Sequence, residues 1–199
     1  VEFFSFTKEG GIPLRTTVSE MGPLLLSRIL NLTDVQSDIL RIIFRIADEE
    51  GLLLLDLKDL RSMLQYVSEN SKEYEKSYGK LSTQSLNAIL RSVVALEDRG
   101  GEEFFGEPAI NVKDFFRLTT NSEGVISILD AKSVASDPKI YSTFLLYLLS
   151  ELYENLPEVG DQEKPRMVFF FDEAHLLFQD SSKALLEKIT QVTRLIRSK

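Results

Sequence analysis

Two adjacent carboxylates, Asp172 and Glu173, directly follow five apolar residues that run from Met167 to Phe171. An unbroken run of β-branched and aromatic residues predicts a strand buried on both faces, as in a parallel sheet. The two acids then come at the carboxyl end of that strand, the edge of an open α/β sheet where ligands bind. At this edge the first carboxylate can hold Mg²⁺, usually through water, and the second can polarise a water for attack on a phosphoryl group.

This arrangement, four or more apolar residues followed by Asp-Glu, is the Walker B pattern. The structural alternative is that Asp172 only caps the next helix, because aspartate is favoured at helix N-caps. The run Asp-Glu-Ala-His, which ends at His175, also spells a helicase motif, so a true Asp-Glu-Ala-His helicase is a further alternative. We expect His175 itself to pack or to hydrogen-bond in the first turn of the next segment, rather than to couple nucleotide state to movement.

The composition limits the other kinds of chemistry. The 199 residues include no cysteine and one histidine, which excludes disulfides, thiolate metal sites and His-cluster metal sites. The formal net charge of −8 argues against nucleic-acid binding by this chain alone, because backbone contacts are made by Lys and Arg. No stretch approaches the ~18 consecutive apolar residues of a membrane span, and no signal-peptide pattern is present. We therefore expect a cytoplasmic protein without membrane contact.

The elements that must position the acids follow one another in the second part of the chain. The run 124–130 predicts a second strand, which ends in the acid Asp130, and a long helix is predicted at about 138–152. The strand at 167–171 comes next, and another helix is predicted from about Ser182. Strand, helix, strand, helix is the order of a parallel sheet, so the predicted fold class is α/β.

The segment from Pro23 to about Arg99 has no predicted strand of its own. Amphipathic spacing predicts helices there at 23–30, 35–46, 57–67 and 82–96, with a polar surface loop or frayed helix end at 68–80. Outside this segment we also expect a strand at 1–6 and a short helix at 112–117. Asp56 follows four leucines and imitates the Walker B pattern, but the helical spacing after it favours an N-cap. We therefore predict a helical insertion at 23–100 in a core formed by 1–22 and 101–199.

A Walker B acid needs a phosphate-binding loop, and this sequence contains none. The expected loop is Gly-x-x-x-x-Gly-Lys-Ser/Thr, but Gly79-Lys80 is followed by leucine, and Gly10-Gly11 is followed by no lysine. We therefore expect the loop to precede Val1 in a longer protein of which this chain is a piece. No residue of this chain is predicted to bind the phosphates of a nucleotide.

Four blocks of the sequence resemble the bacterial HerA-like ATPases of the YjgR type, in the HerA/FtsK superfamily of phosphate-loop NTPases. The blocks are 15–28, 53–61, 104–109 and 168–178, and they occur in the right order along essentially the whole chain. The resemblance implies an α/β fold with a partial RecA-like parallel-sheet core, interrupted by a large all-helical insertion. It implies that Asp172 is the Mg²⁺-associated acid and that Glu173 is the catalytic residue that activates water.

The resemblance also implies cofactors and partners for the full-length protein. These are ATP and Mg²⁺, double-stranded DNA as a candidate substrate of a motor or helicase, and further copies of the chain in a hexameric ring. An arginine reaches the neighbour's nucleotide in such rings, but neither Arg194 nor Arg197 can be assigned that role. The isolated piece is expected to be inactive, because the phosphate loop is absent. The alternative is a non-catalytic interaction or regulatory module whose helical insertion binds a partner.

The resemblance carries one structural expectation as well. In RecA-like sheets the phosphate-loop strand neighbours the Walker B strand, so we expect the strand at 167–171 to have an unpaired or borrowed edge here. Smaller candidates are Arg15 and Arg28 for phosphate contacts, although isolated arginines are usually surface residues. Three tyrosines could stack on bases, although their acidic flanks favour a solvated face; they are Tyr66, Tyr74 and Tyr78.

Overall fold

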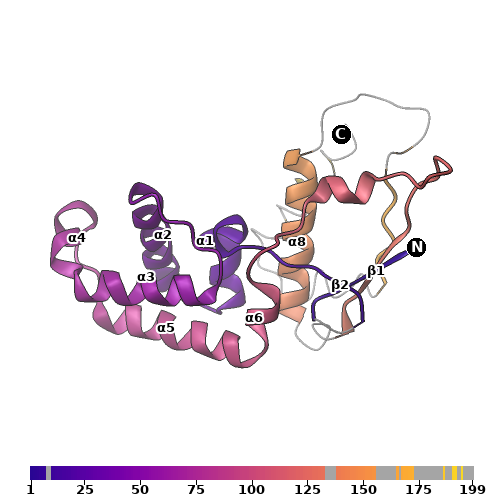
Figure 1. Cartoon of the computed structure of the whole chain (residues 1–199). Helices are drawn as coiled ribbons and strands as arrows, with labels where there is room; N and C mark the ends of the chain where they lie inside the picture. The colour runs from indigo at the N-terminus through magenta and orange to yellow at the C-terminus, as the bar shows by residue number, and fades with distance from the viewer. Residues whose placement is uncertain are drawn as a thin grey trace. The chain divides into compact units, whose positions relative to one another are not determined.

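The chain folds into two compact units in a computed structural model, drawn in Figure 1. One unit, the sheet unit, is Val1–Ile12 with Asn111–Lys199, and the other, the helical unit, is Pro13–Ile110. The structure describes residues 1–7, 10–132, 138–155, 165, 167–172, 186, 190, 191 and 194. Both strands and helices are present, so the α/β class is confirmed. The assignment of the two units to an ATPase core and an insertion stays a prediction.

The sheet unit contains three short strands in the order β2-β1-β3, namely β1 (Glu2–Ser5), β2 (Ile12–Pro13) and β3 (Ser127–Asp130). β1 and β3 run parallel, with Glu2 beside Ser127 and Ser5 beside Asp130. Their carboxyl ends therefore meet at one edge of the sheet. This pair confirms a partial parallel-sheet core and the strand expected at the start of the chain, whereas the RecA-like order of strands stays a prediction.

The long helix α8, Pro138–Asn155, forms the core of the sheet unit. Every side chain from Tyr141 to Leu149 is buried, which is the pattern of a helix covered on all sides and not of an amphipathic surface helix. The ring of Phe144 meets the ring of Phe6 edge-on, with 4.4 Å between their centroids. The apolar residues that predicted this helix therefore also anchor the chain that follows β1.

A 3₁₀ helix, η1 (Val112–Phe116), lies where a short helix was predicted and packs against the same strand. The rings of Phe115 and Phe4 meet edge-on at a centroid distance of 5.3 Å. Just beyond the helix, Arg117 Nη2 donates a hydrogen bond of 2.7 Å to the Glu2 carboxylate. β1 is thus held by an aromatic contact and an ion pair in addition to its ladder.

The helical unit is built from α1 (Val18–Ile29), α2 (Asp34–Glu49), α3 (Leu57–Glu69), α4 (Ser71–Tyr78), α5 (Thr83–Asp98) and the short α6 (Gly101–Phe104). α1 packs on α2, and both α2 and α3 pack on α5. The buried side chains lie at the helical spacing that predicted these four helices, and they include Leu26, Leu40, Ile43, Leu60, Leu64, Leu86 and Ile89. The apolar faces of four helices therefore make one core.

Side-chain caps begin α2, α3 and α5, and the cap at Asp56 was predicted from the sequence. Thr33 caps α2 and Ser82 caps α5. Asp56 caps α3, where its carboxylate accepts hydrogen bonds from the N–H groups of Lys58 and Asp59 at 2.8 and 3.0 Å. The Asp59 carboxylate in turn accepts a hydrogen bond from the Asp56 N–H. This is a capping box, in which each side chain satisfies the other residue's backbone N–H. Asp56 is therefore a helix cap, despite the four leucines before it.

The first helix begins earlier than predicted. α1 starts at Val18 behind a Thr17 cap, and Gly22, with a φ of 72°, bends it before Pro23. A φ of this sign is readily available only to glycine. Pro23 then opens the second part of the helix, because proline suits the first turn of a helix, where no N–H partner is required.

The polar stretch 68–80 was predicted as a loop or frayed helix end, and this is wrong, because it contains the helix α4. Its buried side chain is Tyr74, whose ring lies 6.4 Å from that of Tyr66 and 6.5 Å from that of Tyr78. The Arg45 guanidinium lies 5.7 Å from the centroid of the Tyr78 ring. Tyrosine supplies the apolar contact here, since its ring can pack while its hydroxyl keeps a polar partner.

The two ends of the helical unit are tied together by backbone hydrogen bonds. The Thr16 N–H donates to the Phe104 carbonyl at 3.1 Å, and the Gly106 N–H donates to the Thr16 carbonyl at 2.9 Å. A third bond of 2.8 Å joins the Ile110 N–H to the Arg15 carbonyl. The chain therefore leaves the unit beside the point at which it entered.

The Arg15 side chain reinforces this closure, and we name the arrangement the Arg15 clamp. Its guanidinium donates to the carbonyl oxygens of Phe105 at 2.8 Å, Glu102 at 3.4 Å and Glu107. Gly106 has a φ of 136°, and a Cβ there would overlap Nη2 of Arg15. The guanidinium is thus used to satisfy backbone carbonyls, and the clamp requires glycine at position 106.

Removing the cap of α3 should measurably destabilise the helical unit. In Asp56→Ala, two N–H groups in the first turn of the helix lose their acceptor, so the free energy of unfolding should fall by about 1 kcal/mol. The measurement is urea denaturation followed by circular dichroism. As a control, Asp48→Ala removes an exposed acid from the last turn of α2, where it makes no cap, and should change the value by less than about 0.5 kcal/mol. Equal losses in the two variants would contradict the capping role.

The Arg15 clamp should depend on the shape of the guanidinium and not only on its charge. Arg15→Lys keeps the charge but cannot direct a planar fork of donors at several carbonyls, so it should cost about 1–3 kcal/mol. Arg41→Lys changes an exposed arginine that pairs only with Asp38 within α2, and should cost less than about 0.5 kcal/mol. If thermal melting gave the same shift for both variants, the clamp would contribute no stability.

Candidate functional site

Polar side chains gather at the carboxyl edge of the parallel pair β1–β3. Ser5 and Asp130 are partners in the ladder and end their strands side by side. Ser5 Oγ lies 3.2 Å from Thr7 Oγ1 and accepts a hydrogen bond of 3.2 Å from the Thr7 N–H. Asp130 Oδ1 accepts a bond of 3.0 Å from the Lys132 N–H, and Oδ2 lies 3.8 Å from Lys132 Nζ. Two hydroxyls, a carboxylate and an ammonium thus meet at the edge where ligands bind in open α/β sheets.

The sequence pointed to only one member of this group. Asp130 ends a predicted strand, whereas Ser5, Thr7 and Lys132 belong to no recognisable motif. The available signal was the strand predicted at 1–6, because residues after a parallel strand share an edge with residues after its neighbour. The sequence did not show that β1 and β3 are neighbours, so the grouping could not be predicted.

Asp172 lies close to the first turn of α8, within the same unit. Burial raises the pKa of the Tyr141 hydroxyl in that turn, and the negative charge of Asp172 raises it further. Tyr141 is only 8% exposed, whereas Asp172 is exposed at the surface. α8 is the helix that follows β3, so Asp172 lies near the start of a helix that begins eight residues after Asp130.

The apolar run before Asp172 does not form the predicted strand. Residues 167–171 have no regular secondary structure, and none of the described residues pairs with them in a ladder. Phe170 is 93% exposed and Val168 is 60% exposed, so the expectation that this run is buried on both faces is wrong here. The Phe169 and Phe171 rings stack at 5.7 Å and 9°, on one side of the chain, as side chains two apart lie in an extended segment.

The physical reason is the lack of a partner. A strand is stabilised by hydrogen bonds from neighbouring strands and by layers that cover its two faces. In the part of the chain that the structure describes, β3 has a strand on one side only, and its Ile128 is 44% exposed. The edge expected for a strand at 167–171 therefore stays a prediction, because the run forms no strand and has no ladder partner among these residues.

Several predicted site residues lie outside the described residues. Glu173 and His175 are among them, as is Arg197, and their predicted roles stay predictions. Arg194 is described, and it is helical and exposed, as expected for a helix after the acids. Its neighbour one turn earlier, Thr190, donates a hydrogen bond of 2.7 Å from its hydroxyl to the Leu186 carbonyl.

The smaller candidates in the helical unit have structural roles. Arg15 is bound to backbone carbonyls in the clamp and does not present its guanidinium to a phosphate. Arg28 is half-buried in the last turn of α1. Tyr74 packs between Tyr66 and Tyr78, edge-on to the first ring and tilted against the second.

Asp172 is the described residue of the predicted site that could contact a cation. Among the residues with a described placement, no three His, Cys, Asp or Glu side chains gather where a metal could bind. Mg²⁺ does not need such a cage, since it keeps several waters and is commonly bound through one or two carboxylates and substrate phosphates. The exposed carboxylate of Asp172 fits this mode.

No helix in the described segments is both long enough and apolar enough to cross a membrane.

Comparison with known proteins assigns the family. The family described as "Helicase HerA-like C-terminal" matches residues 1–199, which is the whole chain. No curated protein matches the chain, and no solved structure matches it. The match confirms the resemblance seen in the four blocks of sequence. The chain therefore belongs to the helicase HerA-like C-terminal family.

Proposed function

We propose that the intact protein is a Mg²⁺-dependent ATPase of the HerA/FtsK type and that this chain supplies the Walker B acids. The observation that carries the proposal is the family match over the whole chain, combined with the apolar run that ends at Asp172 and Glu173. Membership of this family supports a protein related to the HerA-like ATPases. The two acids are the residues of this chain that fit the chemistry of phosphoryl transfer to water.

The two acids have different roles in this proposal. The Asp172 carboxylate would help to hold Mg²⁺, and its exposure leaves it accessible for that contact. The Glu173 carboxylate accepts a hydrogen bond from the attacking water and so orients and polarises it. Mg²⁺, when bound with ATP, neutralises charge that develops on the phosphate oxygens.

The phosphate-binding loop is supplied by a segment outside these 199 residues. No glycine-rich loop with the required lysine occurs in the sequence, and the Arg15 guanidinium is occupied by carbonyls. A segment outside these 199 residues would also account for the exposure of residues 167–171, because it would supply the strand that they lack. A phenylalanine that moves from water to a core contributes about 1.5–3 kcal/mol, so a neighbouring strand would convert this run into the buried strand that its composition predicts.

Double-stranded DNA is the proposed substrate of the complete assembly, and a hexameric ring is the proposed assembly. The net charge of −8 means that this chain has an excess of carboxylates over Lys and Arg. The cations that contact DNA phosphates are therefore concentrated on one face or lie in other parts of the intact protein. The RecA-like core and the trans-acting arginine belong to the same proposal.

Neutralising Glu173 should separate nucleotide binding from hydrolysis. The intact Glu173→Gln protein should bind ATP with unchanged affinity, because the amide keeps the size of the side chain. It should hydrolyse ATP at least about a hundredfold more slowly, because the amide cannot act as a base towards the attacking water. Fluorescent-nucleotide titration and steady-state phosphate release measure the two properties. Hydrolysis at the unmodified rate would rule out the role of Glu173.

Asp172→Ala should slow hydrolysis strongly, and the activity that remains should need a higher Mg²⁺ concentration. The matched control is Asp56→Asn, which removes the carboxylate after the other leucine-rich run and preserves a good N-cap, so it should keep full activity. Activity stimulated by double-stranded DNA would support the motor. Activity that DNA does not change would support the ATPase assignment and contradict the assignment as a DNA motor. An intact protein with no activity would favour the non-catalytic interaction module.

A further inference from the structure

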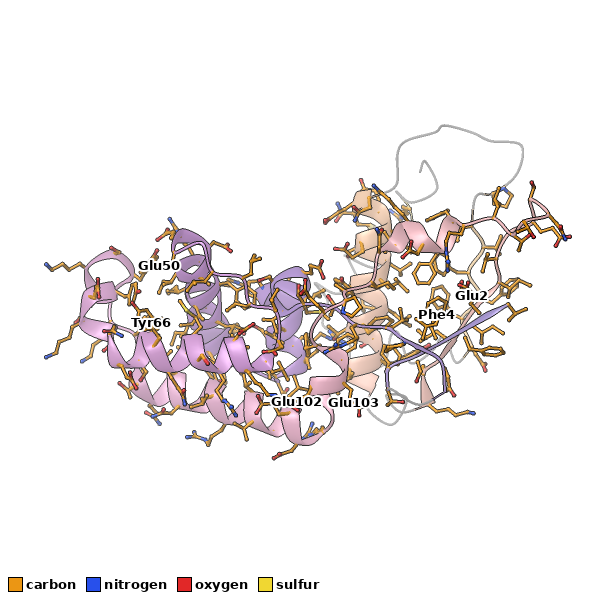
Figure 2. The ribbon with its side chains drawn as sticks, in the orientation of Figure 1. Glu2, Phe4, Glu50, Tyr66, Glu102 and Glu103 are labelled. Atoms are coloured by element: carbon orange, nitrogen blue, oxygen red, sulfur yellow. The ribbon has the colours of Figure 1, made fainter. Side chains whose placement is uncertain are left out.

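The helical unit has an open apolar groove between the α2–α3 loop and one face of α3, and we name it the Leu53 groove. Its volume is about 280 Å³. Leu52 and Leu53 form the side of the groove that belongs to the loop, and Met63 and Tyr66 form the side that belongs to α3. In Figure 2, Tyr66 and the groove residue Glu50 lie at the same end of the unit.

The groove exposes large apolar side chains. Leu53 is 72% exposed, Leu52 48% and Tyr66 44%, whereas Met63 is buried. Single exposed leucines are common on protein surfaces, but exposed leucines and an aromatic ring around a concave site mark a docking surface. Tyrosine adds contact area at a small entropic cost, since its ring has few rotatable bonds.

The loop that carries the two leucines is fixed in place. The Leu52 N–H donates to the Ala47 carbonyl at 2.8 Å, and the Leu54 N–H donates to Ser19 Oγ at 2.9 Å. The Ser19 N–H donates back to the Leu54 carbonyl at 2.8 Å. The backbone is thus bonded on both sides of Leu53, which holds the leucine in water. A preformed surface loses less entropy on binding than a loop that must first become ordered.

The charged side chains that line the groove are both acids. They are Glu50, which is exposed, and Asp59, which is held by the N–H groups of Leu55 and Asp56. The groove therefore favours a cation next to an apolar side chain. The three basic side chains close to these acids in sequence each pair with another acid, Arg45 with Glu49, Lys58 with Glu102 and Arg61 with Glu97.

The size and lining of the groove point to a peptide and not to a nucleotide. Small-molecule sites usually occupy about 300–1,000 Å³, so this groove is at or below the lower limit. No Lys or Arg lines it to receive a phosphate. Its volume suits one or two large apolar side chains, which are the usual anchors of a helix docked in a groove.

We propose that the Leu53 groove docks a short amphipathic segment of a partner protein, which packs leucine or aromatic side chains against Leu53 and Tyr66 and places Lys or Arg beside Glu50. This interaction is separate from the proposed ATPase chemistry and uses neither Asp172 nor Glu173. Changes in the groove should therefore weaken partner binding and leave ATP hydrolysis unchanged.

The apolar part of the proposal can be tested with a defined probe. The probe is a fluorescein-labelled peptide of about 14 residues, or four helical turns, made of leucine at helical spacing and lysine elsewhere. Fluorescence anisotropy measures its affinity for the intact protein. Leu53→Ser should weaken binding about tenfold. Leu24→Ser changes a leucine that is 64% exposed on α1, outside the groove, and should change the affinity by less than about twofold.

The charge complementarity has its own test. Glu50→Gln should weaken binding about threefold and reduce its salt dependence, because one favourable charge contact is lost. Glu75→Gln changes an exposed acid of α4 that does not line the groove, and it should have no effect. A probe with glutamate in place of every lysine should not bind, and a probe with serine in place of every leucine should not bind.

Several outcomes would overturn the proposal. These are failure of the leucine–lysine probe to bind, equal losses in Leu53→Ser and Leu24→Ser, and equal binding of the glutamate probe. Sedimentation velocity would expose another occupant, since self-association that Leu53→Ser abolishes, without probe binding, would assign the groove to a second copy of the chain. Circular dichroism melting of each variant shows that it is folded.

Discussion

The parallel pairing of β1 and β3 is the contact on which the sheet unit depends. It joins residues 2–5 to residues 127–130, and the whole helical unit lies between them in the chain. A pairing over such a separation is favourable only if the intervening chain brings its ends back together, because closing a long flexible loop costs entropy. The Arg15 clamp meets this requirement, since it joins the start of the helical unit to its end through a guanidinium and three backbone hydrogen bonds.

Most of the helical unit could be predicted because its determinants are local. An apolar residue every three or four positions and caps such as Thr33, Asp56 and Ser82 define a helix without knowledge of distant residues. The missed helix α4 shows where this fails. Its buried side chain is a tyrosine, Tyr74, which the polar composition of the stretch concealed. The strand predicted at 167–171 fails for another reason, because a strand requires a partner that its own sequence does not specify.

In the candidate site, too, the features that depend on local sequence could be predicted, and those that depend on distant residues could not. Asp172 was identified because an apolar run followed by acids is a local pattern, and Asp56 was separated from it by the helical spacing that follows. The grouping of Ser5, Thr7, Asp130 and Lys132 depends on which strands are neighbours, which is a property of the folded sheet. The interaction between Asp172 and Tyr141 likewise joins two segments that no local pattern connects.

The closure of the helical unit has an evolutionary consequence. A segment that enters and leaves at one point behaves as a cassette, whose interior can gain, lose or exchange helices while the distance between its ends stays constant. Such a cassette depends on the residues at its base, here Arg15 and Gly106, because they hold its two ends together. The surface around Leu53 can then change while the ends of the unit, and the strands β1 and β3 on either side of it in the chain, keep their positions.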